Sequence, residues 1–155
     1  MTQRFNKGIV LRHSAFTMIE LVFVIVILGI LAGVAIPRLA VTRDDAMIVK
    51  GKSQVAAIRS GIALQKSKRL LEGNTTALTL DTNTTTTAEG QELFKDVLDY
   101  PIISKNADGH WMKTTTGYSF KILGQTIPFT YNATTGFTCD TTNSSTGTNC
   151  KSLTQ

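Results

Sequence analysis

FTMIELVFVIVILGILAGVAI, residues 16–36, is the stretch of sequence that decides the fold. Thr17 and Glu20 are its only clearly polar residues, and nothing polar interrupts it from Leu21 onward. An α-helix rises about 1.5 Å per residue, so this stretch would cover about 30 Å, the thickness of the hydrocarbon core of a bilayer. The sequence therefore predicts a membrane-spanning helix near the N-terminus.

An ordinary secretory signal is the alternative interpretation of this stretch. Gly33-Val34-Ala35 offers the small residues that signal peptidase accepts, and cleavage there would place the mature N-terminus near Ile36. Against this, the apolar run is long for a signal peptide, it contains an acid, and residues 14–17 separate it from the basic residues before it. We therefore favour the membrane helix.

Charge is distributed unevenly along the 155 residues, whose net charge is +5. Residues 1–15 carry three basic residues and no acid, residues 38–69 carry a net charge of +6, and residues 70–155 carry −3. We expect the basic middle segment to meet anionic lipid headgroups or acidic faces of adjacent subunits. Contact with nucleic acid is less favoured, because no aromatic residues interleave these charges.

Glu20 is unusual because it is an acid at one end of an apolar helix. An ionised carboxylate within a membrane costs a few kcal/mol, so such residues are usually paired or functional. A side chain near the end of the span can also extend toward the headgroups. The residues around Glu20 favour a functional role.

The segment Ala15-Phe16-Thr17-Met18-Ile19-Glu20-Leu21, preceded by a short basic leader, resembles the class III signal sequences of type IV pilins and type II secretion pseudopilins. The resemblance implies cleavage by prepilin peptidase between Ala15 and Phe16, followed by N-methylation of Phe16. It also implies that Glu20 pairs with the Phe16 amine of a neighbouring subunit during filament assembly. Ala15 departs from the family, which usually has glycine before the cleaved bond.

The same resemblance implies where the protein resides and what it contacts. A pilin-like precursor is a single-pass protein of the bacterial inner membrane, with its N-terminus in the cytoplasm and its head in the periplasm. Its expected partners are membrane lipid, prepilin peptidase, an inner-membrane assembly platform and other pilin-like subunits of a homo- or hetero-oligomeric filament.

The apolar helix is expected to continue beyond the membrane, to about Leu71. Ile48, Val55, Ile58 and Ile62 recur at helical spacing and line one face. Pro37 is expected to bend the helix, because its ring displaces the carbonyl of Gly33.

Three further glycines, Gly29, Gly51 and Gly61, are either flexible points or sites of close helix packing. We divide the chain into a leader (1–15), a transmembrane helix (16–37), a helical continuation (38–71) and a head (72–155) that ends in a C-terminal loop.

The head is predicted to be an antiparallel sheet packed on the helix, which gives an α+β fold with the ladle shape of pilin-like subunits. Gly73 is expected to end the helix, residues 74–90 to form an exposed loop, and residues 89–99 to form a short helix. Four strands are expected, at Trp111-Met112, Tyr118–Ile122, Ile127–Tyr131 and Gly136–Cys139. Pro128 favours an edge position for its strand.

Cys139 and Cys150 are the only cysteines, and both lie in the part expected outside the cytoplasm, so they are predicted to form a disulfide. Asp140 and Asn143 offer only one carboxylate, so calcium is not expected there and no metal site is assigned. Asn74 and Asn83 each follow an acid by two residues and precede a threonine by two, a pattern that resembles bacterial N-glycosylation acceptors.

An enzyme is not expected, because no set of nucleophile, base and orienting residue can be assembled after the leader with His13 departs. No cofactor or specific nucleic-acid ligand is expected. We expect a filament subunit, a secretion pseudopilin first and a type IV pilus or DNA-uptake subunit second. A secreted soluble binding protein and a solitary membrane-anchored receptor remain the alternatives outside this family.

Overall fold

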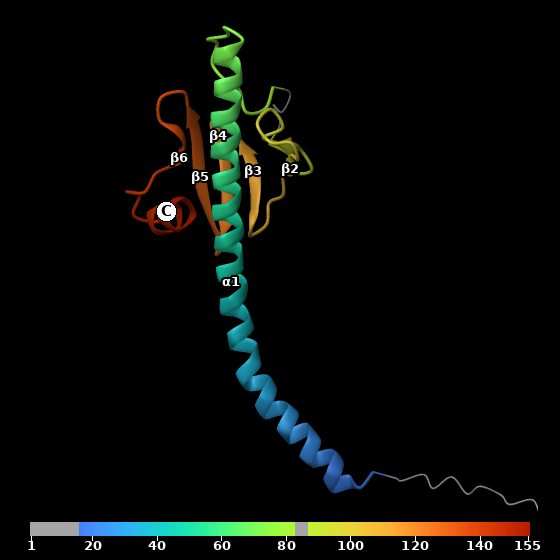
Figure 1. Cartoon of the computed structure of the whole chain (residues 1–155). Coiled ribbons are helices and arrows are strands. Elements are labelled where there is room, and N and C mark those ends of the chain that lie inside the picture. The colour runs from blue at the N-terminus through green and yellow to red at the C-terminus, as the bar shows by residue number, and fades with distance from the viewer. Residues whose placement is uncertain (1–15, 83–86) are drawn as a thin grey trace, which may run out of the picture. The chain divides into compact units, whose positions relative to one another are not determined.

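The computed structural model describes residues 16–82 and 87–155, with residues 36–42 described by their backbone alone. The predicted leader, including Ala15, and Asn83 lie outside the described residues. The elements in chain order are α1 (Met18–Leu71), β1 (Glu92–Leu93), β2 (Ile102–Ile103), β3 (His110–Thr114), β4 (Gly117–Ile122), β5 (Gln125–Asn132), β6 (Gly136–Cys139) and α2 (Gly147–Thr154) (Figure 1). Helices and antiparallel sheets together confirm the α+β class.

The chain divides into two compact units, one ending at Ala40 and one running from Val41 to Gln155. In the first unit, every described side chain from Phe16 to Ala35 is exposed. The second unit contains the whole hydrophobic core.

The C-terminal end of α1 is set by Gly73, as the sequence predicts. Gly73 has a φ of +71°, a left-handed conformation that glycine adopts without a steric penalty. The amide of Asn74 donates to the carbonyl of Arg69 at 2.8 Å, and the amide of Gly73 donates to the carbonyl of Leu70 at 3.1 Å. This pair of bonds is the Schellman motif, which satisfies the last carbonyls of the helix.

The four predicted strands are confirmed as β3 to β6, a meander in the order β3-β4-β5-β6. The turn between β4 and β5 is Leu123-Gly124, where both residues have positive φ values, 51° and 72°. Two successive positive φ values define the type I′ turn, whose twist matches that of the flanking strands.

The edge position expected for the strand of Pro128 is wrong, because β5 lies between β4 and β6. Along an antiparallel ladder, hydrogen-bonded pairs alternate with non-hydrogen-bonded pairs. Counted from the pair that closes the two-residue turn, Ile122 with Gln125, the pair of Ser119 with Pro128 is a non-hydrogen-bonded one. The proline nitrogen therefore faces the β6 side. On that side, the pairing of β5 with β6 ends with Phe129 and Cys139. Pro128 lies one residue beyond this last pair, so its missing N–H removes no hydrogen bond from the ladder.

The short helix expected at residues 89–99 is also wrong. Its first half forms β1, which pairs with β2, and Phe94 then adopts a φ of +61°, which no helix permits. The next two amides bond outside the segment: the Lys95 amide donates to Asp81 Oδ1 at 3.2 Å, and the Asp96 amide donates to the carbonyl of Leu80 at 3.3 Å. The Val97 and Leu98 amides then donate to the Phe94 carbonyl, which closes a single turn and not a helix.

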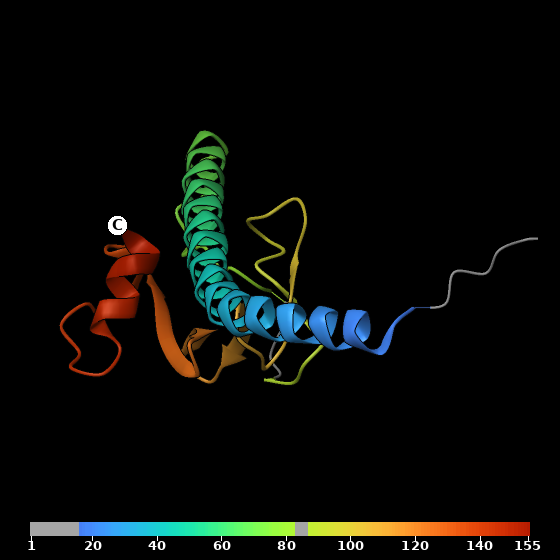
Figure 2. The ribbon, with the colours of Figure 1, turned by 90° about the horizontal axis from the view of Figure 1, so that it is seen from below.

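The core of the second unit lies between α1 and the four-stranded sheet. Val55, Ile58 and Ile62 of the predicted helix face are buried there, against aromatic residues of the sheet that include Trp111 and Phe120. Figures 1 and 2 show α2 and the β1–β2 region on opposite sides of the C-terminal half of α1. The helical pattern predicted for residues 48–62 is therefore the face that buries the sheet.

Candidate anchoring and assembly site

The N-terminus of α1 is closed by reciprocal bonds between Thr17 and Glu20. The Thr17 amide and hydroxyl both donate to Glu20 Oε2 at 3.3 Å, and the Glu20 amide donates to Thr17 Oγ1 at 3.3 Å. This is a capping box, which satisfies amides at the helix start that have no intrahelical acceptor. This cap was not among the features predicted from the sequence, although threonine followed three residues later by glutamate is its signature.

The capping box fixes where the Glu20 carboxylate lies before any partner arrives. A carboxylate in the first turn interacts favourably with the positive end of the helix dipole. Phe16, the residue next to the predicted cleavage point, is exposed. The pairing of Glu20 with a neighbouring amine stays a prediction, as do the cleavage and methylation at Phe16.

One described helix segment is long and apolar enough to cross a membrane. It runs from Met18 to Ala35 with a mean hydropathy of 2.8, and none of it is buried within the chain. Gly29 and Gly33 have no atom within 4 Å of where a Cβ would be, among the described residues. No contact inside the chain therefore explains these two glycines. The bend predicted at Gly33 and Pro37 stays a prediction.

Gly51 and Gly61 have a clear packing role, which decides between the two interpretations offered for them. A Cβ on Gly61 would lie 2.0 Å from the carbonyl oxygen of Val97. One on Gly51 would lie 2.6 Å from Leu153 and 2.7 Å from Phe120. Glycine at these positions lets the head approach α1 closely.

Half of the basic residues predicted to face lipid or other subunits are bonded inside the chain instead. Four cations of α1 donate to backbone carbonyls of the head at 2.8–3.2 Å. These bonds join Lys50 to Gly109, Arg59 to Phe137, Lys66 to Ala133, and Arg69 to Thr76 and Ala77. A long cationic side chain can reach carbonyls left unpaired at strand and loop ends, so these charges attach the head to the helix.

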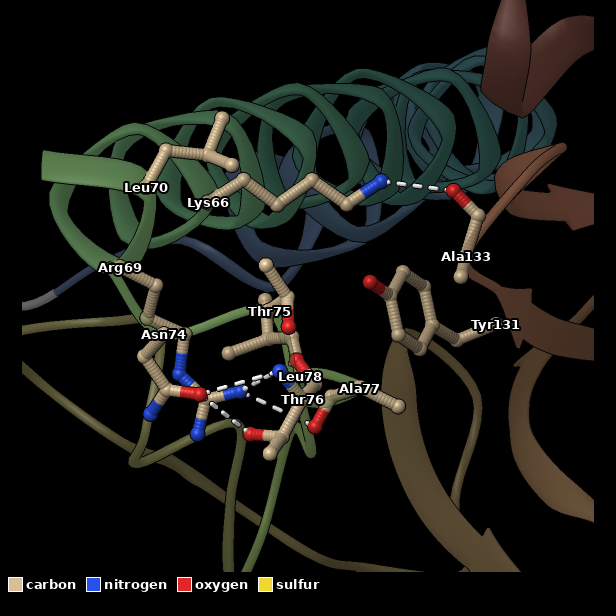
Figure 3. Close-up of a pocket in the computed structure, with 10 residues that line it drawn as sticks. All are labelled: Lys66, Arg69, Leu70, Asn74, Thr75, Thr76, Ala77, Leu78, Tyr131 and Ala133. Carbon is tan, nitrogen blue, oxygen red and sulfur yellow. Dashed lines mark hydrogen bonds between the residues drawn. The ribbon is translucent and has the colours of Figure 1, made fainter. Parts of the chain in front are cut away.

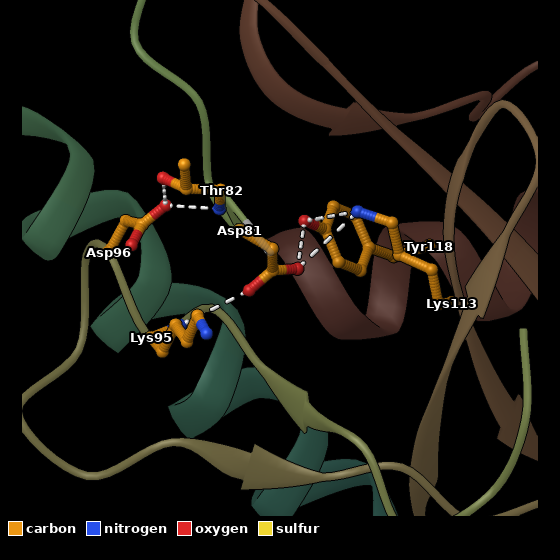
Figure 4. Close-up of polar contacts among 6 residues, drawn as sticks. All are labelled: Asp81, Thr82, Lys95, Asp96, Lys113 and Tyr118. Carbon is orange, nitrogen blue, oxygen red and sulfur yellow. Dashed lines mark hydrogen bonds and ion pairs between the residues drawn. The ribbon is translucent and has the colours of Figure 1, made fainter. Parts of the chain in front are cut away.

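A buried polar cluster fastens the loop after α1 to the β3–β4 hairpin (Figure 4). The Asp81 side chain is fully buried, accepts a hydrogen bond from the Tyr118 hydroxyl, and lies 3.4 Å from Lys113 Nζ. Lys113 also donates to the Tyr118 hydroxyl at 3.0 Å. Burial raises the pKa of Tyr118, and the neighbouring Asp81 carboxylate raises it further. No sequence signal links these three positions.

The predicted disulfide is present in the structure, where Cys139 at the end of β6 is bonded to Cys150 in α2 with their Cα atoms 6.0 Å apart. The segment expected to be a C-terminal loop contains the helix α2, which buries Cys150 and Leu153 against the core. The bond therefore holds the last helix of the chain to the sheet.

Two further residues considered in the sequence, Asp140 for calcium and Asn74 for glycosylation, make local hydrogen bonds. Asp140 Oδ1 accepts bonds from the amide and hydroxyl of Thr142, which lower its pKa. Within residues 16–82 and 87–155, no group of three His, Cys, Asp or Glu side chains is placed to hold a metal ion. Asn74 is exposed, with its side-chain oxygen accepting bonds from Thr76.

Comparison with known proteins finds one family model and two relatives that match part of the chain. Residues 11–36 match the family model of the prokaryotic N-terminal methylation motif. The chain is 43% identical over 54 residues to the major component of the type IV narrow pilus of Thermus thermophilus, and 36% identical over 55 residues to core protein G of the type II secretion system of Pseudomonas aeruginosa.

These matches cover 35% and 36% of the chain, and 47% and 39% of the two relatives. The chain thus spans less than half the length of these relatives. No solved structure matches it.

Both relatives are named as components of a pilus or a secretion system rather than as enzymes, in agreement with the expectation that this chain is not an enzyme. The matched motif contains the capping box and the exposed apolar helix. The N-terminal part of the chain thus carries the prokaryotic N-terminal methylation motif and is similar to a component of a type IV pilus and to one of a type II secretion system.

Proposed function

We propose that this chain is a structural subunit of a type IV pilin-like filament, made as a membrane-anchored precursor. The observation that carries the proposal is the N-terminal methylation motif at the start of a helix whose first 18 residues are unburied and, apart from Glu20, apolar. Exposed apolar surface on this scale is stable only in lipid or against other protein. Membrane anchoring and later filament packing supply the two environments in turn.

Glu20 is the residue that selects the filament as the second environment. Cleavage between Ala15 and Phe16 creates an α-amino group whose pKa near 8 keeps it largely protonated at neutral pH. The capping box holds the Glu20 carboxylate at the helix start, where an amine of a neighbouring subunit can reach it. Such a charge-assisted contact strengthens where water is excluded.

The second unit, which comprises the C-terminal part of α1 and the head, is the exported part of the chain. Its core, disulfide and buried Asp81 cluster all lie within residues 41–155, so it keeps its own fold while the apolar helix changes surroundings. We place it in the periplasm, with the assembly platform, prepilin peptidase and other pilin-like subunits as partners.

Secretion is the first candidate for the system that uses this filament, because the apolar segment from Ile25 to Ala32 resembles those of pseudopilins. A type IV pilus, for motility, adhesion or DNA uptake, is the second candidate. It is favoured by the disulfide that closes the C-terminal segment, an arrangement found in many pilins.

The mass of the purified protein tests the processing step. Cells with prepilin peptidase should yield a chain that lacks residues 1–15 and carries one added methyl group. Cells without the peptidase should retain the full precursor. A mature N-terminus at any residue other than Phe16 contradicts the proposal.

Filament incorporation tests the role of Glu20. Glu20→Ala should insert and be processed normally but should be absent from sheared filaments, whereas the exposed head acid Glu72, changed to alanine, serves as the matched control and should assemble. Normal incorporation of Glu20→Ala would show that charge pairing is not required.

Loss of secreted proteins on deletion of the gene identifies a pseudopilin, and loss of surface pili with secretion intact identifies a pilin.

A further inference from the structure

A pocket lies where the end of α1, the loop that follows it and the end of β5 meet (Figure 3). Its volume is about 210 Å³, space for about seven water molecules at 30 Å³ each. The lining residues are Lys66, Arg69, Leu70, Asn74 to Leu78, Tyr131 and Ala133. Nothing in the proposed filament function uses this pocket.

The charge of the pocket has one sign. Lys66 and Arg69 contribute two cations, and no carboxylate is among the lining residues. Lys66 Nζ uses one of its three donors on the carbonyl of Ala133, at 2.8 Å. Among the described residues, Arg69 bonds the loop through Nη1, to the carbonyls of Thr76 and Ala77, and its other nitrogens make no such bond. An anion is therefore the ligand that this lining favours.

A buried hydroxyl at the pocket is a second, independent observation that points to a ligand. The Tyr131 hydroxyl is buried and has no hydrogen-bond partner among the described residues. Figure 3 shows it pointing into the space between Lys66 and Thr75. A buried polar group without a partner is unfavourable, and most such groups are bonded to protein, water or ligand. An acceptor oxygen placed beside Lys66 would take this bond.

Apolar side chains form another part of the wall, beside the polar residues Asn74, Thr75 and Thr76. Leu70, Ala77, Leu78, Ala133 and the ring of Tyr131 surround the polar end. Inorganic anions would leave this apolar surface without contacts, whereas an alkyl group would bury against it. The lining therefore has one end for a negative charge and one for a short hydrocarbon chain.

We propose that this pocket binds a small organic monocarboxylate. The carboxylate lies against Lys66 and accepts the hydrogen bond of the Tyr131 hydroxyl. The alkyl portion packs on Leu70, Ala77 and Leu78. The ligand is held between the helix, the loop and the sheet, so its binding also tightens the end of α1 against the head.

Four probes separate the two recognition elements, with binding to the purified full-length protein followed by NMR shifts and by the thermal midpoint. Butyrate contains both elements, acetate and phosphate contain the charge without the chain, and butyramide contains the chain without the charge. Butyrate should bind at least about tenfold more tightly than the other three, a difference of about 1.4 kcal/mol. Equal binding of butyrate and butyramide, or no binding of butyrate, would overturn the proposal.

Variants locate the site. Tyr131→Phe keeps the ring and should weaken butyrate binding several-fold, while the thermal midpoint without ligand should not fall, because the removed hydroxyl has no partner. Lys66→Met should weaken binding about tenfold, and Lys68→Met, an exposed lysine of the same helix outside the lining, is the matched control. Unchanged butyrate affinity in both Tyr131→Phe and Lys66→Met would place the ligand elsewhere and refute the assignment.

Discussion

Replacing Gly61 by alanine tests whether this glycine is a flexible point of α1 or a contact. Glycine in a helix is about 1 kcal/mol less favourable than alanine, so a flexible exposed Gly61 would make Gly61→Ala stabilising by that amount. The structure predicts the opposite sign. The new Cβ would lie 2.0 Å from the carbonyl oxygen of Val97, and the obstructing atom belongs to the backbone rather than to a movable side chain.

The magnitude follows from what must move. Val97 is itself buried and follows Phe94 in a turn closed by the bonds of Val97 and Leu98 to the Phe94 carbonyl. Shifting that turn disturbs Phe94, which packs on Trp111, Tyr118 and Phe137. Overpacking of this kind costs about 1–3 kcal/mol, and the backbone obstruction places it at the upper end. After the helical gain, we expect a net loss of about 2 kcal/mol.

The assay is thermal unfolding of the detergent-solubilised protein, followed by circular dichroism. For a unit of this size, about 1 kcal/mol shifts the midpoint by about 4 °C, so Gly61→Ala should lower it by about 8 °C. Ser60→Ala is the matched control, because Ser60 is the exposed neighbour on the same helix and should change the midpoint little or raise it slightly. A midpoint for Gly61→Ala at or above that of the parent would refute the close-contact argument.

Three other changes probe the polar cluster and the disulfide. Lys113→Met leaves the fully buried Asp81 carboxylate without its cation and should lower the free energy of unfolding by about 3 kcal/mol in urea titrations, with partial recovery when Asp81→Asn is added. The pKa of Tyr118 is raised in the folded state, so its contribution to the free energy of unfolding is complete below about pH 10 and is lost as pH rises further. Stability should therefore fall less steeply with alkaline pH in Tyr118→Phe. Replacing Cys139 and Cys150 by serine should cost about 3 kcal/mol, and dithiothreitol should then have no further effect.

Each of these predictions has a clear contrary result. No loss of stability in Lys113→Met would mean that solvent already compensates Asp81. Identical alkaline profiles with and without the Tyr118 hydroxyl would exclude its ionisation as the cause of unfolding. A serine double variant as stable as the oxidised parent would show that the disulfide does not stabilise the fold by restricting the conformations of the unfolded chain.

The sequence determined the parts of this protein that depend on local pattern. Residues 21–35 are apolar without interruption, and they form a helix whose surface is not buried within the chain. Helical spacing from Ile48 to Ile62 predicted the face that packs on the sheet, and Gly73 predicted the helix end through its positive φ. Alternation of apolar and polar residues predicted the two central strands of the main sheet, and Trp111-Met112 and Gly136–Cys139 were the further strand candidates on either side.

The tertiary structure decided every feature that depends on positions far apart in the sequence. It placed β5 inside the sheet, because the end of β6 leaves the Pro128 nitrogen without a ladder partner. It turned residues 92–93 into a strand, because their partner is Ile102-Ile103. It brought Asp81 to Lys113 and Tyr118, and Tyr131 to Lys66, from segments that no short-range pattern connects.

The division has a physical cause. Hydrophobic periodicity, capping and turn conformation act over a few residues, so they can be read from adjacent letters. Burial of charge, close approach at glycine and the edges of a sheet depend on which surfaces meet after folding. The N-terminal anchor is therefore legible in the sequence of this protein, whereas the contacts that join its head to α1 are decided only by the folded chain.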